Sequence, residues 1–417
     1  MSVSIRLFVL LIFSITGFHA AAQAVVGDFL LTARTDHDVI SLEEQIRYLD
    51  TKPYRLSPLQ KTEFRTGVNQ LDPSRMEYAL RLNPANPWEN KNNTKYFQEY
   101  QAVLALEKEL VLKRALLVRY KHVVELLYAN EKVSIREEEF RLVSAQLSVL
   151  ERQQQSSFFK GDDYLDANLR QMDIMVSREE SVFEYDNQFQ RMATLYPPME
   201  ANKKMWKDIV FISVERMERV VDSLYLVTGT PSTLAYREKQ IDLANQEYKL
   251  EKSNINAGFV QAEYQEFRIN QNRKPWNINM GVTIPITNPN KGDMTKRKLE
   301  VIEAQHERDE TKSEVLANKE MARNHFKNLV SRYNDIHQKI ESLRVGNLAS
   351  ALSNMKENNP TAVIRFQGNV LKLKAMELKL KHEILISYID FLGFTDQLQK
   401  RPLINFLTNN LAVLSVE

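Results

Sequence analysis

The stretch NINMGVTIPITNPNKGD, residues 277–293, alternates between apolar and polar residues and then breaks at two prolines. Such period-two alternation predicts a β-strand with one face against an apolar phase and the other against water. The apolar face would carry Ile278, Met280, Val282, Ile284 and Ile286. The polar face would carry Asn277, Asn279, Gly281 and Thr283, with Pro285 closing the strand. A strand of about 10 residues is long enough to cross a bilayer when it is tilted.

The chain on both sides of this strand is typical of long helices. Only 11 Gly and 13 Pro occur among 417 residues, and no proline lies between Pro87 and Pro197 or between Pro289 and Pro360. Apolar residues recur there at helical spacing, with charged residues between them. One helix over residues 88–157 would be about 105 Å long, and this length alone favours a coiled coil.

Breaks in the helical pattern predict two helical hairpins. At the first tip, Gly161 would end one helix in the left-handed conformation and an aspartate would cap the next. At the second tip, residues 356–360, an asparagine would end the helix and Pro360 would start the next one.

A second strand precedes the first hairpin and indicates an internal repeat. Residues 76–84 alternate as residues 277–289 do, and both stretches end in Asn-Pro and open a long helix. The apolar face would carry Met76, Tyr78, Leu80 and Leu82, opposite Glu77, Ala79, Arg81 and Asn83. The agreement predicts a twofold repeat with a period of about 200 residues.

Each strand has a candidate partner just upstream, in residues 62–68 and, with poorer alternation, in residues 258–269. Four strands leave two unpaired edges, which lipid does not tolerate. Closed membrane barrels begin at about eight strands, so strands that span a membrane must share a barrel with other copies. The alternative is a soluble sheet whose apolar face packs on the helices.

Residues 1–24 are predicted to be a cleaved signal peptide. Arg6 precedes an apolar run of about 12 residues, and Ala22-Gln23-Ala24 has the pattern of a cleavage site. An uncleaved anchor is the alternative, although the run is shorter than the roughly 20 residues that a spanning helix needs. No later segment has 18 consecutive apolar residues, so we expect an exported protein.

Several classes of function are not indicated. The 56 basic and 54 acidic residues nearly balance, which gives no reason to expect nucleic acid. The chain has no cysteine and no phosphate-binding loop, nucleophile motif or histidine metal motif. The six histidines after the signal peptide are scattered: His37, His122, His306, His325, His337 and His382. We therefore expect no catalytic residues, no cofactor and no metal, and hence not an enzyme.

The mature chain resembles the TolC-like outer membrane efflux protein family. The likeness rests on GVTIPI at residues 281–286 before a helix from about Met294, and on the helix that precedes the second pair of strands, from Ser232 to about residue 257. The resemblance implies a mainly helical fold with long antiparallel hairpins forming an α-helical tunnel. It also implies four strands per chain in a shared trimeric transmembrane β-barrel of 12 strands.

The same resemblance implies a passive exit duct of a tripartite efflux or secretion system. The duct would lie in the cell outer membrane of a Gram-negative bacterium and extend into the periplasm. A periplasmic adaptor and an inner-membrane pump would gate it at the helical tips. The alternative function is a periplasmic coiled-coil scaffold or adaptor without a membrane barrel.

Residue roles follow from the strand faces and from the resemblance. The lipid-facing residues would be Met76, Tyr78, Leu80, Leu82, Ile278, Met280, Val282 and Ile284. The lumen-facing residues would be Glu77, Arg81, Asn277, Asn279 and Thr283. The adaptor would contact Phe158, Phe159 and Gly161 at the first tip and Asn358 and Asn359 at the second. The periplasmic aperture would be formed by Asp162, Asp163 and Asp166.

The predicted organisation has five parts. Residues 1–24 are the signal peptide, 25–198 the first repeat, 199–230 a connector, 231–400 the second repeat and 401–417 a C-terminal tail.

Overall fold

The computed structural model describes residues 24–52, 58–68, 76–155, 159–209, 211–227, 229–255, 258–265, 276–283, 290–345 and 360–414. All but the last residue of the predicted signal peptide therefore lies outside the described residues. The chain divides into two compact units. Unit 1 comprises Met1–Val39, Val111–Gly229 and Val315–Glu417, and unit 2 comprises Ile40–Leu110 and Thr230–Glu314.

Most of the described chain is helical, as predicted. The α-helices are α2 (His37–Thr51), α3 (Pro87–Arg152), α4 (Gly161–Leu195), α5 (Val214–Tyr225), α6 (Ser232–Ser253), α7 (Lys291–Val345) and α9 (Pro360–Phe394). Short 3-10 helices cover Thr32–Thr35, Pro197–Asn202 and Met205–Asp208. With 66 residues, α3 is about 99 Å long, so the long helix predicted from its charged and apolar periodicity is confirmed. Among the described residues, no helix has both the length and the apolar character needed to cross a membrane.

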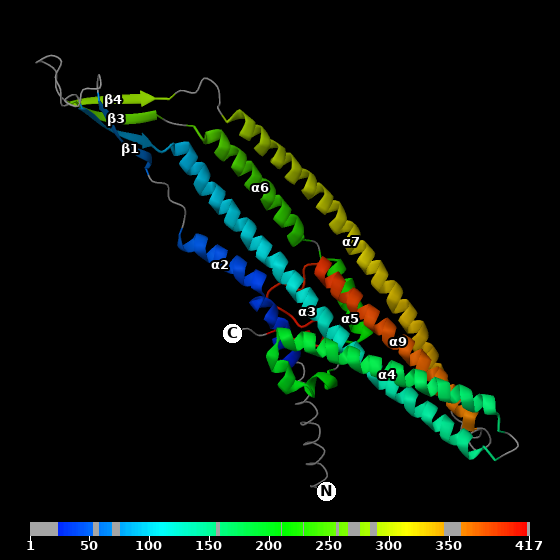
Figure 1. Ribbon diagram of the computed structural model, residues 1–417. Coiled ribbons are helices and arrows are strands. Elements are labelled where there is room, and N and C mark those ends of the chain that lie inside the picture. The colour runs from blue at the N-terminus through cyan, green and yellow to red at the C-terminus, as the bar shows by residue number, and fades with distance from the viewer. Residues whose placement is uncertain are drawn as a thin grey trace, which may run out of the picture. The chain divides into compact units, whose positions relative to one another are not determined.

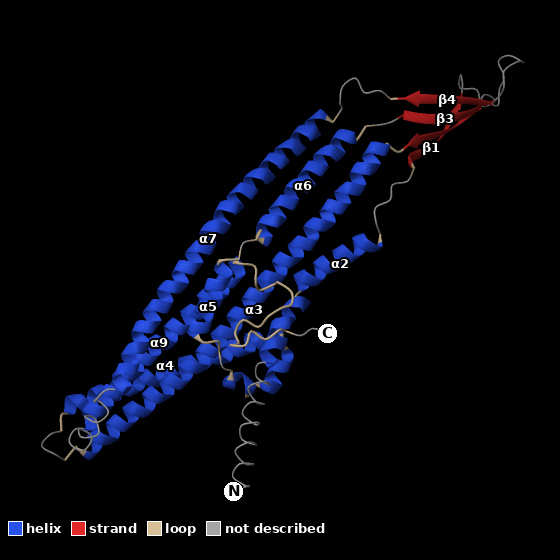
Figure 2. Cartoon of the chain, turned by 180° about the vertical axis from the view of Figure 1, so that it is seen from behind, coloured by secondary structure: helices blue, strands red, loops and turns tan. Residues whose placement is uncertain are grey.

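Unit 2 contains a four-stranded antiparallel sheet (Figures 1 and 2). Its strands are β1 (Leu59–Val68), β2 (Met76–Pro84), β3 (Gly258–Gln265) and β4 (Trp276–Val282), in the order β1-β2-β3-β4. The two predicted strand pairs, β1 with β2 and β3 with β4, are present, and β2 pairs with β3 to join them. The strands β1 and β4 are the edges of this sheet, so each offers unpaired backbone groups in the single chain.

Asparagine side chains fix the two bends where strand becomes helix. The Asn86 Oδ1 accepts a hydrogen bond of 3.0 Å from the Trp88 N–H at the start of α3. The Asn86 Nδ2 donates to the carbonyl oxygens of Ser253 (2.8 Å) and Ile255 (3.1 Å), between α6 and β3. The Asn290 Nδ2 donates to the Asn254 carbonyl at 2.7 Å. Both bends are thereby tied to one short segment, residues 253–255.

Ion pairs connect α6 to the parts of α3 and α7 that lie in unit 2. Arg237 contacts Glu307 at 2.6 Å and Arg297 contacts Glu247 at 2.9 Å, which joins α6 to α7. Lys239 contacts Glu99 of α3 at 3.2 Å. The two ribbon views agree that α6 lies between α3 and α7 (Figures 1 and 2). Exposed ion pairs of this kind are each weak, and here they accompany the packing of three neighbouring helices.

Unit 1 holds the main hydrophobic core. Its buried residues come from α3, α4, α5, α7, α9, the segment between α4 and α5, and both terminal segments. The largest include Phe29, Tyr120, Phe189, Trp206, Phe326, Tyr388 and Phe391. The hydroxyl of Tyr120 donates a 2.6 Å hydrogen bond to the Ile404 carbonyl and accepts one of 3.3 Å from the Phe406 N–H. These bonds hold the C-terminal segment against α3.

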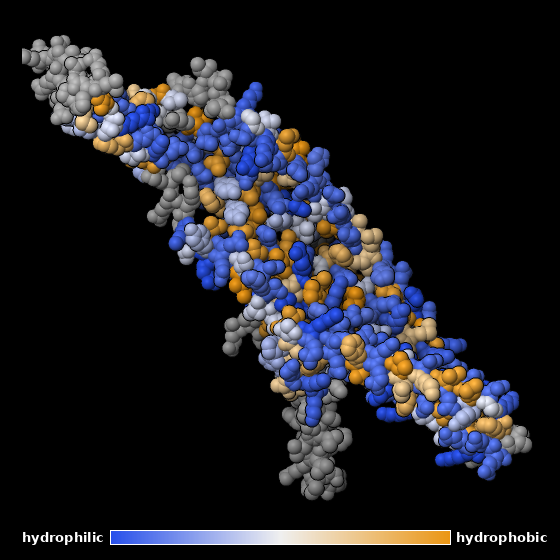
Figure 3. Space-filling model, viewed as in Figure 1, coloured by the Kyte–Doolittle hydropathy of each residue, from blue (hydrophilic) through white to orange (hydrophobic). Residues whose placement is uncertain are grey.

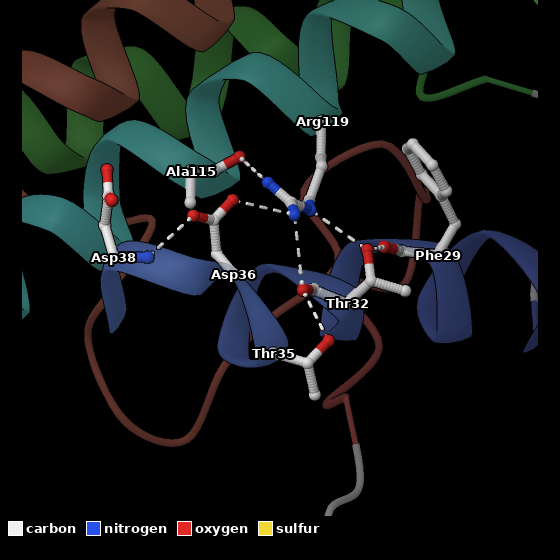
Figure 4. A network of polar contacts seen from close by, with 7 residues as sticks. All are labelled: Phe29, Thr32, Thr35, Asp36, Asp38, Ala115 and Arg119. Atoms are coloured by element: carbon white, nitrogen blue, oxygen red, sulfur yellow. Dashed lines mark hydrogen bonds and ion pairs between the residues drawn. The ribbon is translucent and has the colours of Figure 1, made fainter. Parts of the chain in front are cut away.

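A buried arginine fixes the N-terminal segment to α3 (Figure 4). Arg119 is 5% exposed and bonds to Thr32 through Nε, 2.9 Å from its hydroxyl, and through Nη2, 3.3 Å from its carbonyl. Its Nη2 also lies 3.0 Å from Asp36 Oδ2, and its Nη1 donates to the Ala115 carbonyl at 3.1 Å. The charge is therefore satisfied on every side, as a buried guanidinium requires.

Candidate functional site

The sheet has two chemically different faces, and the register aligns them strand by strand. One cross-strand row is Phe64, Leu80, Ala262 and Ile278, and the next towards the helices is Thr62, Leu82, Val260 and Met280. The row on the other side is Thr66, Tyr78, Tyr264 and Trp276. Each row is mostly apolar or aromatic, so the alternation found in single strands extends across the whole sheet.

The apolar face is exposed in the chain. Val282 is 80% exposed, Met280 76%, Phe64 69% and Ile278 68%. A soluble sheet buries such a face against other elements, so the alternative of a sheet packed on the helices through these residues is not what the structure shows. The predicted lipid-facing residues Met76, Tyr78, Leu80, Leu82, Ile278, Met280 and Val282 all share this face. Ile284 lies outside the described residues.

The opposite face is hydrophilic. Its rows are Glu63, Arg81, Gln261 and Asn279, then Arg65, Ala79, Glu263 and Asn277, then Gly67, Glu77 and Gln265. Lys61 and Arg65 both form ion pairs with Glu63, and Gln265 donates to Glu77 at 3.3 Å. Four of the predicted lumen-facing residues, Glu77, Arg81, Asn277 and Asn279, lie together on this face. The fifth, Thr283, is exposed just after β4.

One aromatic residue interrupts the hydrophilic face. The ring of Phe259 covers Gly281 so closely that a Cβ at that glycine would lie 2.4 Å from the ring. The guanidinium of Arg81 lies over the same ring, 3.8 Å from its centre. Strand periodicity gave no signal for the contact between Arg81 and Phe259, because this contact depends on which strands are neighbours in the sheet.

The first helical tip differs from the prediction in its capping. After α3 ends at Arg152, α4 begins at Gly161, which is its first residue and has no left-handed backbone. The predicted left-handed helix end at Gly161 is therefore wrong, because the turn that ends α3 lies earlier, at residues 153–155. Lys160 occupies the N-cap position, so the predicted aspartate cap is also wrong. Asp162 and Asp163 instead lie in the first turn, where their negative charges interact favourably with the positive end of the helix dipole.

The predicted contact residues at the tips are only partly described. Gly161 is exposed and nothing lies within 4 Å of a Cβ built on it. Phe159 is partly exposed and its ring lies 6.1 Å from that of Tyr164. Phe158, Asn358 and Asn359 lie outside the described residues. As predicted, Pro360 begins a helix, α9.

Of the predicted aperture residues, Asp162 and Asp166 are exposed. Asp163 forms a 3.4 Å ion pair with Arg365 near the start of α9. This pair connects the first turn of α4 with the beginning of the second hairpin's returning helix. The sequence contained no signal that would match Asp163 with Arg365.

A line of exposed apolar residues runs along α4. It comprises Leu165, Leu169, Met172, Val176 and Phe183, which are between 54% and 68% exposed. Hydrophobic residues also lie among hydrophilic ones on this part of unit 1 in Figure 3. The spacing is that of one seam of a coiled coil, and no helix among the described residues covers this seam.

Other possible chemistry was tested against the geometry. Among the residues that the structure describes, no group of three or more His, Asp or Glu side chains could hold a metal ion. An open groove of about 660 Å³ in unit 1 is lined by Glu125, His325, His382 and Asp390, among others. His382 lies 3.1 Å from Glu125 and Lys121 lies 2.7 Å from Asp390, so these carboxylates already pair between α3 and α9.

The arrangement of long helices and a four-stranded sheet is the TolC-like channel fold. Similar solved structures include the outer membrane protein VceC of Vibrio cholerae, with 11% sequence identity and a TM-score of 0.64 over 89% of this chain and 96% of that chain. The CmeC outer membrane channel of Campylobacter jejuni has 10% identity and a TM-score of 0.62 over 91% of this chain and 85% of that chain.

The open state of the MtrE outer membrane channel of Neisseria gonorrhoeae is also similar, with 11% identity and a TM-score of 0.59 over 89% of this chain and 88% of that chain. No family model matches the sequence, and no curated protein matches it either. At these identities the likeness establishes the fold, and the predicted fold class is confirmed in its helices and its sheet.

Proposed function

We propose that this chain is the outer membrane exit duct of a tripartite efflux or secretion system. The observation that carries the proposal is the two-faced sheet. Its apolar face is exposed in the single chain, and the chain has a fold that is found in outer membrane channels. The apolar face contacts lipid and the hydrophilic face lines a water-filled lumen. The helices extend into the periplasm.

The sheet requires further copies of the chain. Strands β1 and β4 leave unpaired edges, which cannot remain open in lipid. A trimer provides 12 strands, and pairing β4 of one copy with β1 of the next removes every edge. The exposed apolar line on α4 is surface that neighbouring copies would cover along the tunnel.

The dimensions and the aromatic residues agree with a membrane-spanning sheet. The 10 residues of β1 extend about 33 Å, which at a tilt of about 40° crosses roughly 25 Å, the height of the apolar band of such barrels. Tyr78, Tyr264 and Trp276 form an aromatic row near the ends of the strands away from the helices. Aromatic side chains are enriched towards membrane interfaces, and this row lies two residues, or roughly 5 Å along the membrane normal, from the Ile278 row on the side away from the helices.

The duct works without a catalytic group. Glu77, Arg81, Asn277, Asn279 and Thr283 keep the lumen hydrated, while the helical tips form the closable end. The Asp163–Arg365 ion pair joins the two hairpins there, and a docked adaptor and pump would favour a second packing of the helices. The energy for transport comes from the pump.

The proposal extends to the chain's organisation. Residues 1–24 direct export and are removed, 25–198 and 231–400 are duplicated halves joined by a connector at 199–230, and 401–417 form a tail. The order strand, strand, long helix occurs once in each half, which supports the duplication.

Fractionation of expressing cells tests the location and the assembly. We expect the protein in the detergent-soluble outer membrane fraction, as an oligomer that resists heating in mild detergent and crosslinks as a trimer. Recovery as a detergent-free periplasmic protein would contradict the channel and favour a scaffold or adaptor.

The docking role of the first tip needs a separate test. The test needs a substitution that changes the surface of the tip without changing its fold. Gly161→Pro is unsuitable, because proline is tolerated at the first position of a helix and adds little surface. Gly161→Trp is suitable, because it adds a large side chain in open space. We expect Gly161→Trp to abolish export while the trimer forms normally. Gly229→Trp is the matched control, because a Cβ there also has no neighbour within 4 Å. Normal export by Gly161→Trp would exclude this tip as the docking surface.

A further inference from the structure

The Arg81 side chain occupies a special position on the hydrophilic face of the sheet. Its guanidinium lies over the Phe259 ring, 3.8 Å from the centre, and Gly281 provides the space that this ring fills. The contact therefore spans three neighbouring strands, β2, β3 and β4. An aromatic ring attracts a guanidinium over its face and fixes the plane of the group.

The carboxylate nearest to Arg81 in the register is engaged elsewhere. Glu63 is the direct cross-strand partner of Arg81, but it forms ion pairs with Lys61 and Arg65 on its own strand. Among the residues that the structure describes, Arg81 has no carboxylate partner, and its Nε is buried without a hydrogen bond. Glu63 is thus paired twice while Arg81 has no described partner of opposite charge, although the described charges of the whole face balance, with Lys61, Arg65 and Arg81 against Glu63, Glu77 and Glu263.

We propose that Arg81 is an anion-contact position in the lumen, where it binds carboxylate or phosphate groups of passing solutes. The inference rests on the proposed function, since it places the hydrophilic face in the lumen. Stacking on Phe259 holds the guanidinium while its terminal Nη1 and Nη2 groups, rather than the buried Nε, are available to a planar anion. In a symmetric assembly every copy contributes one Arg81 at the same depth, which makes a ring of cations of the kind that selects anions in pores.

Ion selectivity in planar lipid bilayers tests this assignment. With the purified full chain and a KCl gradient, the reversal potential gives the ratio of chloride to potassium permeability. At about 0.1 M salt the screening length is about 10 Å, so this ratio responds to a charge that lines the lumen. Arg81→Gln should lower the permeability ratio roughly twofold or more, because it removes a full ring of charge. Asn279→Gln, in the same cross-strand row, is the neutral control and should not change the ratio.

Inorganic phosphate provides a second, independent measurement. Phosphate added to the wild-type duct should reduce the chloride current by occupying the Arg81 position. Phe259→Leu retains every charge but releases the guanidinium, so block by phosphate should weaken roughly threefold. This comparison decides the matter even if Arg81→Gln fails to assemble.

The outcomes separate the two proposals. Wild-type channels that are not blocked by phosphate overturn the anion-contact role and leave the duct intact. An unchanged permeability ratio in Arg81→Gln has the same meaning. A wild-type protein that forms no oligomer in the bilayer overturns the proposed function, and this inference with it.

Discussion

Replacing Ile278 by arginine distinguishes a sheet in lipid from a sheet in water. Ile278 belongs to the central cross-strand row with Phe64, Leu80 and Ala262, and it is already 68% exposed in the single chain. If this face met water, an exposed arginine would change the free energy of unfolding by roughly 0.5 kcal/mol or less. If it meets lipid near the bilayer centre, the cost is about 2–4 kcal/mol for each copy.

The geometry of β4 predicts how the cost depends on depth. Val282 lies four residues beyond Ile278, which is about 13 Å along the strand and roughly 10 Å along the membrane normal at a tilt of about 40°. Val282 therefore lies near the edge of the apolar band, and Val282→Arg should cost about 1 kcal/mol or less. Asn279→Arg, between them on the hydrophilic face, should cost almost nothing.

A urea titration of the protein refolded into phospholipid vesicles measures these differences, with the oligomer band on unboiled gels as readout. A cost of about 2–4 kcal/mol shifts the folding equilibrium roughly 30- to 700-fold per copy, so the Ile278→Arg midpoint should fall far below that of Asn279→Arg. Equal midpoints would refute the lipid contact of this face. A penalty for Asn279→Arg alone would show that the two faces are exchanged.

Three further predictions concern the core of unit 1. Tyr120→Phe should lower the free energy of unfolding by about 1–2 kcal/mol, because it removes the hydrogen bonds to residues 404 and 406. Tyr388→Phe should be neutral or stabilising, since the Tyr388 hydroxyl is buried without a partner among the described residues; chemical denaturation in detergent compares the pair, and an equal loss in both would contradict the hydrogen-bond argument. Burial raises the pKa of both tyrosines above the ordinary value, so the folded protein keeps protons that the unfolded chain releases above a pH of about 10. Stability should be complete below that pH and fall above it by about 1.4 kcal/mol per pH unit for each tyrosine. Tyr388→Phe should therefore lower the total slope by about 1.4 kcal/mol per pH unit in titrations between roughly pH 10 and 12. Asp36→Ala should cost about 1–3 kcal/mol, because it leaves the buried Arg119 without its carboxylate; an unchanged thermal midpoint would argue against this.

Local patterns were enough to predict the strands and the long helices. Alternation around Leu80 and Met280 and the Asn-Pro pairs that follow the two strands identified β2, β4 and the helices after them. The strand β3, which precedes β4, was harder to recognise, since its alternation fades after Tyr264. Its membership in the sheet comes from pairing with β2 and β4 on both sides, which a pattern within one strand cannot reveal.

The error in the capping is local: Gly161 is expected to end α3, but the helix stops nine residues earlier and the glycine opens α4. The omissions arose where segments far apart in the sequence come into contact. The Arg81–Phe259 stack and the Asp163–Arg365 pair each join segments far apart in the sequence. Arg119 reads as an ordinary charged position on a long helix, yet tertiary packing buries it beside Asp36.

The position of the last residues in the core has a consequence for the order of folding. Tyr120 bonds to a residue 284 positions later, and Phe29 near the N-terminus belongs to the same buried cluster as Phe406 and Leu414. A chain that leaves the ribosome from its N-terminus therefore cannot complete this core until residues 403–414 have been synthesised. Early segments stay loosely packed during that time, with only local helices and hairpins available to them. A polypeptide that must be threaded through a narrow translocation pore benefits from this delay, because the contacts that would block its passage form last.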